Sequence, residues 1–354
     1  MDVKVIEYIK FWKMVIAMKV TIADVAEKAG VSKTTVSRIL NGNYGHNTPE
    51  TIKTVLKVVE ELEYRPNALA KGLKSMKTNV IGIVLSNFRN EFWFNVLEGV
   101  EDTCKDEGYN LMICNSDGDP ELEEQYIKEF QMRQVDGIVI NPTVRNQALY
   151  EKLVHDKYPM VVINRKIEGL QANNVVVDNV KGGYLAVNHL LENGRQYILA
   201  ITYKNENIST WQERIKGYKE ALISNGLTEE SFHILEIENL RKANKQIKQY
   251  LLENPVIDGV FSTNNMLTLE LIEALKKLGK KVPSEMGIVG YDDTIWSKHL
   301  APPLTTIKQP SYDIGKESAK LLIKEIKSKE IATIKNIIFQ PELVVRESSK
   351  EIEQ

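Results

Sequence analysis

The segment TIADVAEKAGVSKTTVSRILNG, residues 21–42, contains two short helical patterns separated by a glycine. Apolar residues recur at helical spacing from Ile22 to Ala29, and Gly30 ends the first pattern. Ser32 is a suitable N-cap for the second. Two short helices joined by a tight turn that contains glycine form a helix-turn-helix unit, whose second helix enters the major groove of DNA. The alternative is an ordinary helical hairpin with a solvated outer face.

The second of these helices has one narrow apolar edge, formed by Val36, Ile39 and Leu40. A helix this short is not stable alone, so it must dock on the first helix and hold its polar edge outward. Cations and hydroxyls are the groups that contact phosphates and the base edges of the major groove. The residues expected on this outward edge are Lys33, Thr34, Ser37 and Arg38.

A third helix is predicted from residue 48 onward, with Thr48 as its cap and Pro49 at its first position. Three helices in so short a span make a small all-α head that reads DNA. The expected inner face of the third helix is Ile52, Val55, Leu56, Val59 and Leu62.

The next segment, YRPNALAKGLKSMK at residues 64–77, has a short helical pattern interrupted by Gly72. Leu69 and Leu73 are spaced i, i+4, but no neighbouring segment offers them a core. We expect this segment to order when two copies meet on DNA, with each Leu73 inserted into a minor groove. A plain interdomain linker is the alternative, because its Pro and Gly fit that role equally well.

The charge of the chain is unevenly distributed. Residues 1–77 hold 13 Lys and Arg against 8 Asp and Glu, whereas the remainder holds 33 against 40. This distribution indicates that the head, and not the body, approaches phosphate.

Two cysteines, Cys104 and Cys114, provide no disulfide or metal-ligand framework, so we expect a reducing, cytoplasmic compartment.

Residues 1–18 are apolar but are interrupted by Lys4, Glu7, Lys10 and Lys13, and no small-residue cleavage site follows. A membrane span needs about 20 apolar residues, so we expect neither a span nor a signal peptide. The periodic pattern begins at Val20, which makes Met18 a plausible natural start. We therefore assign residues 1–18 to an extension outside the fold.

The body, from residue 79, alternates short apolar runs with helical patterns. Nine runs beginning with VIGIVL at 80–85 have the composition of strands buried on both faces, and their order breaks once and restarts. This pattern predicts an α/β fold with two doubly wound parallel-sheet lobes. Ligands in such folds bind beyond the carboxyl ends of the strands, where the loops are rich in Asn, Asp, Arg and aromatic residues. Polar groups and flat rings suit a hydroxylated small molecule.

The chain resembles the LacI/GalR family of bacterial transcription regulators. The resemblance is carried by three separated motifs in order: TIADVAEKAGVSKTTVSRILNG, YRPNALAKGL and GYDDTIWSKHLAPPLTTIKQP. It implies a helix-turn-helix domain over 19–65, a hinge helix and linker over 66–78, and a periplasmic-binding-protein-like core over 79–350. Lobe 1 is expected over about 79–177 plus 309–335, and lobe 2 over about 178–308 plus 336–350.

The resemblance also implies roles for individual residues. In the head, Lys33, Thr34 and Arg38 would face bases, and residues 67–74 would form the hinge helix. The full set of expected DNA contacts is Thr21, Ser32, Lys33, Thr34, Thr35, Ser37, Arg38, Asn41, Asn67, Ala70 and Leu73. The expected contacts with a sugar or related metabolite are Asn87, Phe88, Phe92, Asp117, Asn141, Arg165, Thr210, Arg214, Asn264 and Asp292.

Two of these residues, Arg165 and Arg214, would suit a carboxylate if both faced the cleft, which favours a sugar acid as the effector. The alternative is that either arginine pairs with Asp292 or Asp178. Asn264-Asn265 stands where relatives usually have Asn-Asp, and the loss of that carboxylate is consistent with an acidic ligand.

Other classes of protein fit less well. An α/β enzyme with a helical appendage is disfavoured because the glycine-rich and G-x-S-x-G motifs of such enzymes are absent, and the five histidines form no metal-binding pair. We expect neither a catalytic role nor a cofactor. A sugar carrier without DNA function would leave the head unexplained, whereas a regulator that responds to another metabolite or to a protein remains an alternative.

We expect a homodimer on a palindromic operator, because two heads read two half-sites.

Overall fold

The computed structural model describes residues 20–64, 77–88, 90–143, 145–204, 208–328 and 333–350. The chain divides into two compact units, residues 1–78 and 79–354. The extension 1–18 and the expected contacts Asn67, Ala70 and Leu73 lie outside the described residues. None of the helices in the described ranges has both the length and the hydropathy of a membrane span.

The first unit is a bundle of three short helices, α2 (Ile22–Lys28), α3 (Lys33–Leu40) and α4 (Pro49–Glu61). Ser32 and Thr48 cap α3 and α4 as predicted. The core contains Val25 from α2, Val36 and Ile39 from α3, and Val55 and Val58 from α4. The predicted inner face of α4 was wrong at Leu56, which is 43% exposed. Val58, three residues after Val55, faces the core in its place, whereas Ile52, Val59 and Leu62 pack against the core as predicted.

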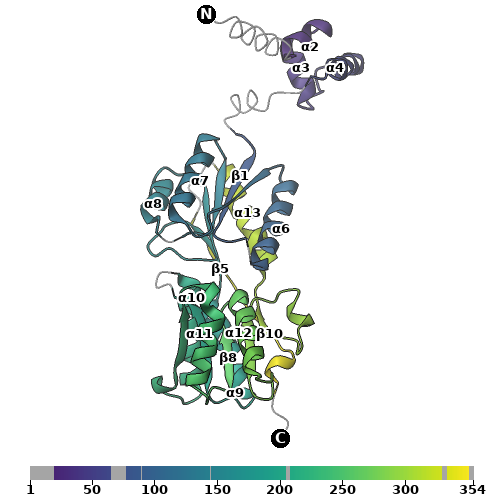
Figure 1. Cartoon of the computed structure of the whole chain (residues 1–354). Helices are drawn as coiled ribbons and strands as arrows, with labels where there is room; N and C mark the ends of the chain where they lie inside the picture. The colour runs from purple at the N-terminus through teal and green to yellow at the C-terminus, as the bar shows by residue number, and fades with distance from the viewer. Residues whose placement is uncertain are drawn as a thin grey trace, which may run out of the picture. The chain divides into compact units, whose positions relative to one another are not determined.

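Lobe 1 is built on a six-stranded sheet of order β11-β5-β4-β3-β1-β2, in which all neighbours are parallel. Helices α6 and α13 cover one face, and α7 and α8 cover the other (Figure 1). The strands are β1 (Val80–Leu85), β2 (Asn110–Asn115), β3 (Gly137–Ile140), β4 (Met160–Ile163), β5 (Asn173–Val177) and β11 (Asn336–Phe339), and the helices are α6 (Glu91–Asp106), α7 (Pro120–Met132), α8 (Gln147–His155) and α13 (Ser311–Lys327).

Lobe 2 repeats this plan with the order β12-β10-β9-β8-β6-β7, and its edge strand β12 is antiparallel to β10. Helices α9 and α10 cover one face, and α11 and α12 cover the other. The strands are β6 (Ile198–Tyr203), β7 (His233–Ile237), β8 (Gly259–Ser262), β9 (Gly287–Tyr291), β10 (Thr305–Lys308) and β12 (Glu342–Val344), and the helices are α9 (Asn179–Glu192), α10 (Ser209–Ser224), α11 (Leu240–Glu253) and α12 (Asn265–Leu278).

The chain passes between the lobes three times, after β5, after β10 and after β11. The expected boundary at residue 336 is one strand too early. Residues 336–339 form β11, which pairs with β5 in lobe 1, and the chain enters lobe 2 between residues 339 and 342. The described fold therefore consists of two doubly wound sheets joined by three crossovers.

Candidate functional site

The outer face of α3 is held in place from both ends of the helix. At its start, the Ser32 hydroxyl accepts a hydrogen bond from the Thr35 amide at 3.1 Å. At its end, the Asn41 side-chain amide donates to the Ser37 carbonyl at 2.7 Å. Four of the residues expected to contact DNA, Ser32, Thr35, Ser37 and Asn41, thus take part in the capping of α3.

Between these caps, α3 divides into an inner and an outer face. Val36 and Ile39 are at most 1% exposed, so the opposite face points to solvent. Lys33, Thr34 and Arg38 are exposed there, as the sequence pattern predicted. Within the described head, this arrangement presents two cations and a hydroxyl on one short helix.

Thr21 has a local structural role at the start of α2. It forms a capping box with Asp24, in which the Thr21 amide donates to the Asp24 carboxylate at 2.7 Å. Hydrogen bonds from the Thr21 amide and hydroxyl hold the pKa of Asp24 below its usual value. The Thr21 side chain is nevertheless exposed, so capping does not remove it from the surface.

Positive charge in the head is local. Residues 20–64 hold five Lys and Arg against six Asp and Glu, but none of the acidic residues lies between Lys28 and Pro49. Glu61, on α4, pairs with Lys28 at 2.9 Å. The surplus counted over residues 1–77 therefore belongs to residues 1–19 and 65–77 and to the turn-helix segment around α3.

In lobe 1, polar side chains meet at the carboxyl ends of three neighbouring strands. Asn141, which follows β3, is fully buried and donates from its side-chain amide to the Ser86 hydroxyl after β1. Its side-chain oxygen accepts from Asn164 after β4 at 3.2 Å. The sheet order β4-β3-β1 brings these residues together, as parallel strands require.

Arg165 lies behind this group and is 9% exposed. Its Nη1 donates to the Pro142 carbonyl at 2.7 Å, whereas its Nε is buried without a partner among the described residues. Burial lowers the pKa of Arg165 to about 10, and the charge of Glu123 opposes that shift. The guanidinium thus remains charged at neutral pH with bonding capacity to spare.

Glu123 is a buried carboxylate that sequence reasoning missed. It accepts hydrogen bonds from the amide and hydroxyl of Thr143, from Asn146 and from the Tyr150 hydroxyl. Burial raises its pKa, and these donors counter the shift. Glu123 therefore fixes the loop that follows β3. A glutamate within the first turns of a helix carries no signal of this role in the sequence.

In lobe 2, Arg214 of α10 is 5% exposed and spans several elements. Its Nε donates to Asn179 at 2.9 Å and its Nη1 to the Thr263 carbonyl at 2.7 Å. Its guanidinium carbon lies 3.5 Å from the ring centroid of Tyr291. Thr210, one turn earlier on α10, is also buried. Arg214 therefore lies at the strand ends of lobe 2, as predicted.

Neither arginine uses a carboxylate partner, which contradicts the alternative that Asp292 or Asp178 neutralises them. In the described ranges no carboxylate oxygen lies within 4.0 Å of Arg165 or Arg214. Asp178 instead caps α9 by accepting from the Lys181 amide at 2.9 Å. Asp292 accepts from Gln309 at 2.6 Å and from Asn90 at 3.0 Å.

Asn90 joins the two lobes and was not predicted. Its side-chain nitrogen donates to Asp292, and its side-chain oxygen accepts from Asn265 at 3.0 Å. Lys166 makes a second bridge by donating to Glu213 at 2.6 Å. The candidate residues after β9 and at the start of α12 therefore face the start of α6 across the interlobe boundary.

Several predicted contacts lie elsewhere or have a simpler role. Phe92 is 6% exposed and lies against Trp93 in the hydrophobic core of lobe 1, with the two rings edge to face. Asp117 is exposed in the turn before α7, with a φ of 50°. Asn264 caps α12 by accepting from the Met266 amide at 2.9 Å. Asn87 is half-buried and Phe88 is 37% exposed, both directly after β1.

Buried polar atoms without partners accumulate at the strand ends. Within the described residues they include Arg165 Nε, Thr202 Oγ1, Thr263 Oγ1, Asn265 Oδ1 and Gln309 Oε1. An unpaired buried polar group costs about 1–3 kcal/mol, so each of these atoms has bonding capacity for a polar group at the strand ends. Both donors and acceptors are present, which suits hydroxyl groups.

Comparison with known proteins agrees with this architecture. Residues 21–67 match the profile of bacterial regulatory proteins of the lacI family, and residues 81–330 match a periplasmic binding protein domain. The chain is 34% identical over 315 residues to a probable HTH-type transcriptional regulator, EndR, of Paenibacillus polymyxa, which covers 88% of this chain and 92% of the relative. It is also 34% identical to the ribose operon repressor of Halalkalibacterium halodurans, over 93% of this chain and 97% of the relative.

A solved structure extends the comparison. The LacI family transcriptional regulator of Enterococcus faecium with bound ribose superposes with a TM-score of 0.68 and is 30% identical. The match covers 77% of this chain and 98% of the other.

Proposed function

Because this chain belongs to the LacI family of bacterial regulatory proteins and is a DNA-binding transcriptional regulator, not an enzyme, we propose that it represses carbohydrate or sugar-acid catabolic genes. A small-molecule effector between the core lobes controls its DNA binding. The finer assignments below, to residues, effector and assembly, are parts of this proposal.

The proposed DNA contacts follow from the exposure of α3. Lys33, Thr34 and Arg38 reach base edges in the major groove, and the residues around the helix caps contact phosphates. The segment 66–78 acts as a hinge that places Leu73 in the minor groove, on the strength of the family resemblance alone. The proposed DNA contacts of α3 are supported by the sequence between Lys28 and Pro49. It contains no acidic residue, which would repel phosphate.

The proposed effector is a sugar or a sugar acid. The observation that carries this proposal is the set of buried unpaired donors and acceptors at the strand ends, together with two buried arginines without carboxylate partners. Hydroxyls would satisfy the unpaired groups, and a carboxylate would be held by Arg165 and Arg214. The similarity to a ribose operon repressor and to a ribose-bound regulator supports the carbohydrate class.

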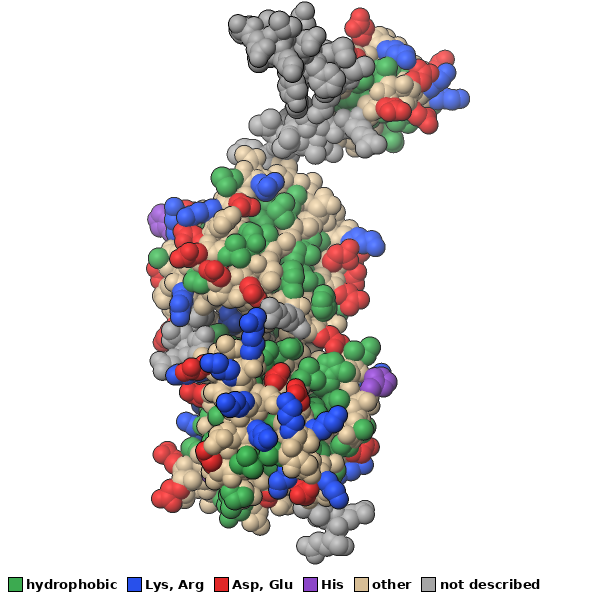
Figure 2. All heavy atoms as spheres, in the orientation of Figure 1, with side chains coloured by type: hydrophobic (Ala, Val, Ile, Leu, Met, Phe, Trp, Pro, Cys, Tyr) green, Lys and Arg blue, Asp and Glu red, His purple; other side chains and the backbone are tan. Residues whose placement is uncertain are grey.

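The proposed assembly is a cytoplasmic homodimer. Hydrophobic side chains are exposed on both lobes (Figure 2), and they include Phe94 of α6, Leu269 of α12 and Ile295 after β9. These elements are neighbours, because the Ile295 amide donates to Glu91 of α6 and Asn265 of α12 donates to Asn90. Exposed apolar side chains on neighbouring elements favour a contact between proteins at this surface. A two-fold dimer places two heads on two half-sites of a palindrome.

The effector would act by changing how far the two lobes close on each other. Asn90 and Lys166 bridge the lobes directly, so a ligand that alters either bridge alters closure. In a dimer this changes the distance between the two hinge segments and thus whether both heads reach DNA. A coupling of about 1–3 kcal/mol gives about 5- to 150-fold regulation.

The test uses the full-length protein, a labelled palindromic duplex selected from random sequence, and fluorescence anisotropy at fixed modest salt. We expect specific binding that ribose, another neutral sugar or a sugar acid such as gluconate changes at least fivefold. Binding without any carbohydrate response would favour another metabolite or a protein co-effector. No preference for any palindrome over random competitor would contradict the proposal.

A further inference from the structure

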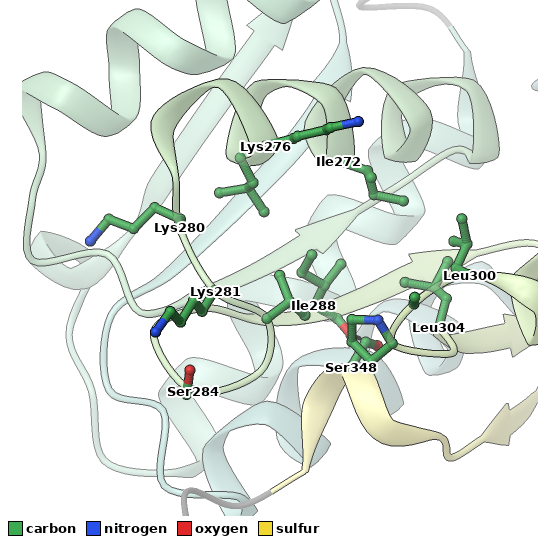
Figure 3. Close-up of a pocket in the computed structure, with 13 residues that line it drawn as sticks. Ile272, Lys276, Lys280, Lys281, Ser284, Ile288, Leu300, Leu304 and Ser348 are labelled. Atoms are coloured by element: carbon green, nitrogen blue, oxygen red, sulfur yellow. Dashed lines mark hydrogen bonds between the residues drawn. The ribbon is translucent and has the colours of Figure 1, made fainter.

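A second cavity lies in lobe 2, between the C-terminal half of α12 and the starts of β9 and β10 (Figure 3). Its volume is about 490 Å³, within the range of small-molecule sites. None of the cleft residues described above lines it. The sugar proposal therefore gives this cavity no role.

The interior of the cavity is apolar. Leu275, Ile288 and Leu304 form its floor and are each 2% exposed. Ile272 and Leu300 are half-buried at its walls, and in Figure 3 Leu300 and Leu304 lie on the same side of the cavity. Apolar surface of this kind favours an alkyl or aryl group over water.

The rim of the cavity carries three lysines, and one carboxylate, that of Glu285, lies beside two of them. Lys276, Lys280 and Lys281 line it, and none of its described lining residues is Asp or Glu. Lys280 has a distant partner in Glu285 at 3.7 Å. In the described part of the chain, the ammonium groups of Lys276 and Lys281 have no carboxylate within 4.0 Å. Their long stems let the ammonium groups turn toward the mouth while the methylenes stay on the apolar wall.

From this pairing of an apolar floor with a cationic rim, we propose that the cavity binds a monoanionic acid with an apolar tail, a medium-chain fatty or aryl carboxylate. The tail occupies the floor, and the carboxylate lies between Lys276 and Lys281. A sugar fits poorly, because none of the described lining residues is aromatic. The hydroxyls of a sugar would meet aliphatic carbon instead. The regulator would thus have a second ligand site, separate from the interlobe cleft.

The test titrates full-length protein with sodium octanoate by isothermal calorimetry, with 1-octanol as the uncharged analogue and acetate as the tail-less one. Octanoate is expected to bind about tenfold more tightly than either analogue. The double variant Lys276→Gln/Lys281→Gln should lose that preference. The matched variant Lys242→Gln/Lys245→Gln removes two charges from α11 of the same lobe and should keep it. Arg214→Ala should also bind octanoate normally, which separates this site from the sugar site.

A bulky group at the mouth provides a second check, and Ser284→Trp should weaken octanoate binding while the unfolding temperature stays unchanged. Equal affinity for octanoate and octanol, or equal affinity of wild type and the Lys276/Lys281 variant, would overturn the proposal. Binding that appears only when the protein is monomeric would also overturn it, because it would assign the cavity to a second copy of the chain.

Discussion

Arg38 is the side chain on which the predicted reading of DNA most depends, because it is exposed on α3 while its neighbour Ile39 is buried. We predict that Arg38→Ala weakens operator binding by about 1–3 kcal/mol if the guanidinium contacts a base. Fluorescence anisotropy at fixed salt measures the loss. Lys57→Ala on α4, whose side chain is 74% exposed, removes the same charge from another surface and should change affinity much less. Equal losses in the two variants would refute the docking of α3.

Arg214 should separate effector response from DNA binding. In Arg214→Ala we expect the sugar-dependent change in operator affinity to disappear, while affinity without sugar stays within about twofold, because the head is a separate unit. Lysine retains the positive charge but lacks the planar guanidinium whose nitrogens donate to Asn179 and Thr263. Arg214→Lys should therefore restore the response only in part. Arg241→Ala, on the exposed side of α11, is the control. A full sugar response in Arg214→Ala would exclude this residue as a ligand contact.

Single residues also show where the sequence was informative about the site. The position of Arg165, Asn141 and Arg214 at the strand ends could be predicted, because each follows a recognisable strand or lies in the first two turns of a helix beyond one. Phe92 was predicted as a contact from a loop rich in aromatics, whereas the structure places residues 92, 93, 96 and 100 on the buried face of α6. Asn90 could not be predicted, because its partner Asp292 lies 202 positions away and only the folded lobes bring them together.

At the scale of elements, the cap of α3 controls how firmly the reading helix is held. We predict that Ser32→Ala costs about 1 kcal/mol of local stability, because the Thr35 amide loses its partner. Hydrogen exchange of the full-length protein should rise in residues 33–40, and operator affinity should fall. Thr48→Ala removes the corresponding cap of α4 and should raise exchange mainly in residues 49–61. Unchanged exchange in α3 would contradict the prediction.

The ion pair of Arg346 and Asp293 holds the segment that follows β12, the last strand of lobe 2. Its contribution to stability depends on pH in a direction that can be worked out. Arg346 donates from Nη1 and Nη2 to the two oxygens of Asp293, at 2.7 and 3.2 Å. Burial acts to raise the pKa of Asp293, but hydrogen bonds from Arg346 and Thr306 outweigh it and lower the pKa below 3.8. The carboxylate therefore stabilises the fold above pH 3.8, and this contribution is lost as pH falls through the lowered pKa.

We accordingly predict that Asp293→Asn lowers the free energy of unfolding by about 1–2 kcal/mol at pH 7. The difference from wild type should shrink as pH falls from 3.8 through the lowered pKa of Asp293, below which both proteins carry an uncharged group at this position. Urea unfolding at a series of pH values measures it. A difference that stays constant with pH would mean that the ion pair does not contribute.

The elements recognised from sequence are those whose burial is uniform. Strands such as β1, β3 and β4 are buried on both faces, so they read as unbroken apolar runs. The strand β10 was not recognised because its sequence, TTIK, has one apolar residue among four, and β11 and β12 were not recognised because they are partly exposed. That gap placed the entry into lobe 2 at 336, since pairing of β11 with β5 depends on contacts far apart in the chain.

At the scale of the whole molecule, operator binding and subunit association should fail together. Ile295 is 67% exposed beside α6, within the apolar surface proposed to join two copies. Ile295→Glu would bury a charge in that contact, at a cost of at least about 2 kcal/mol, so sedimentation should show a shift from dimer toward monomer. A monomer holds one half-site, and its affinity for a palindrome should fall toward its affinity for a single half-site. Ile223→Glu, at an equally apolar position 55% exposed on α10, should leave the dimer intact. If Ile295→Glu stays dimeric and binds the palindrome as wild type does, the subunits meet through another surface, and lobe closure must reach the heads by a different route.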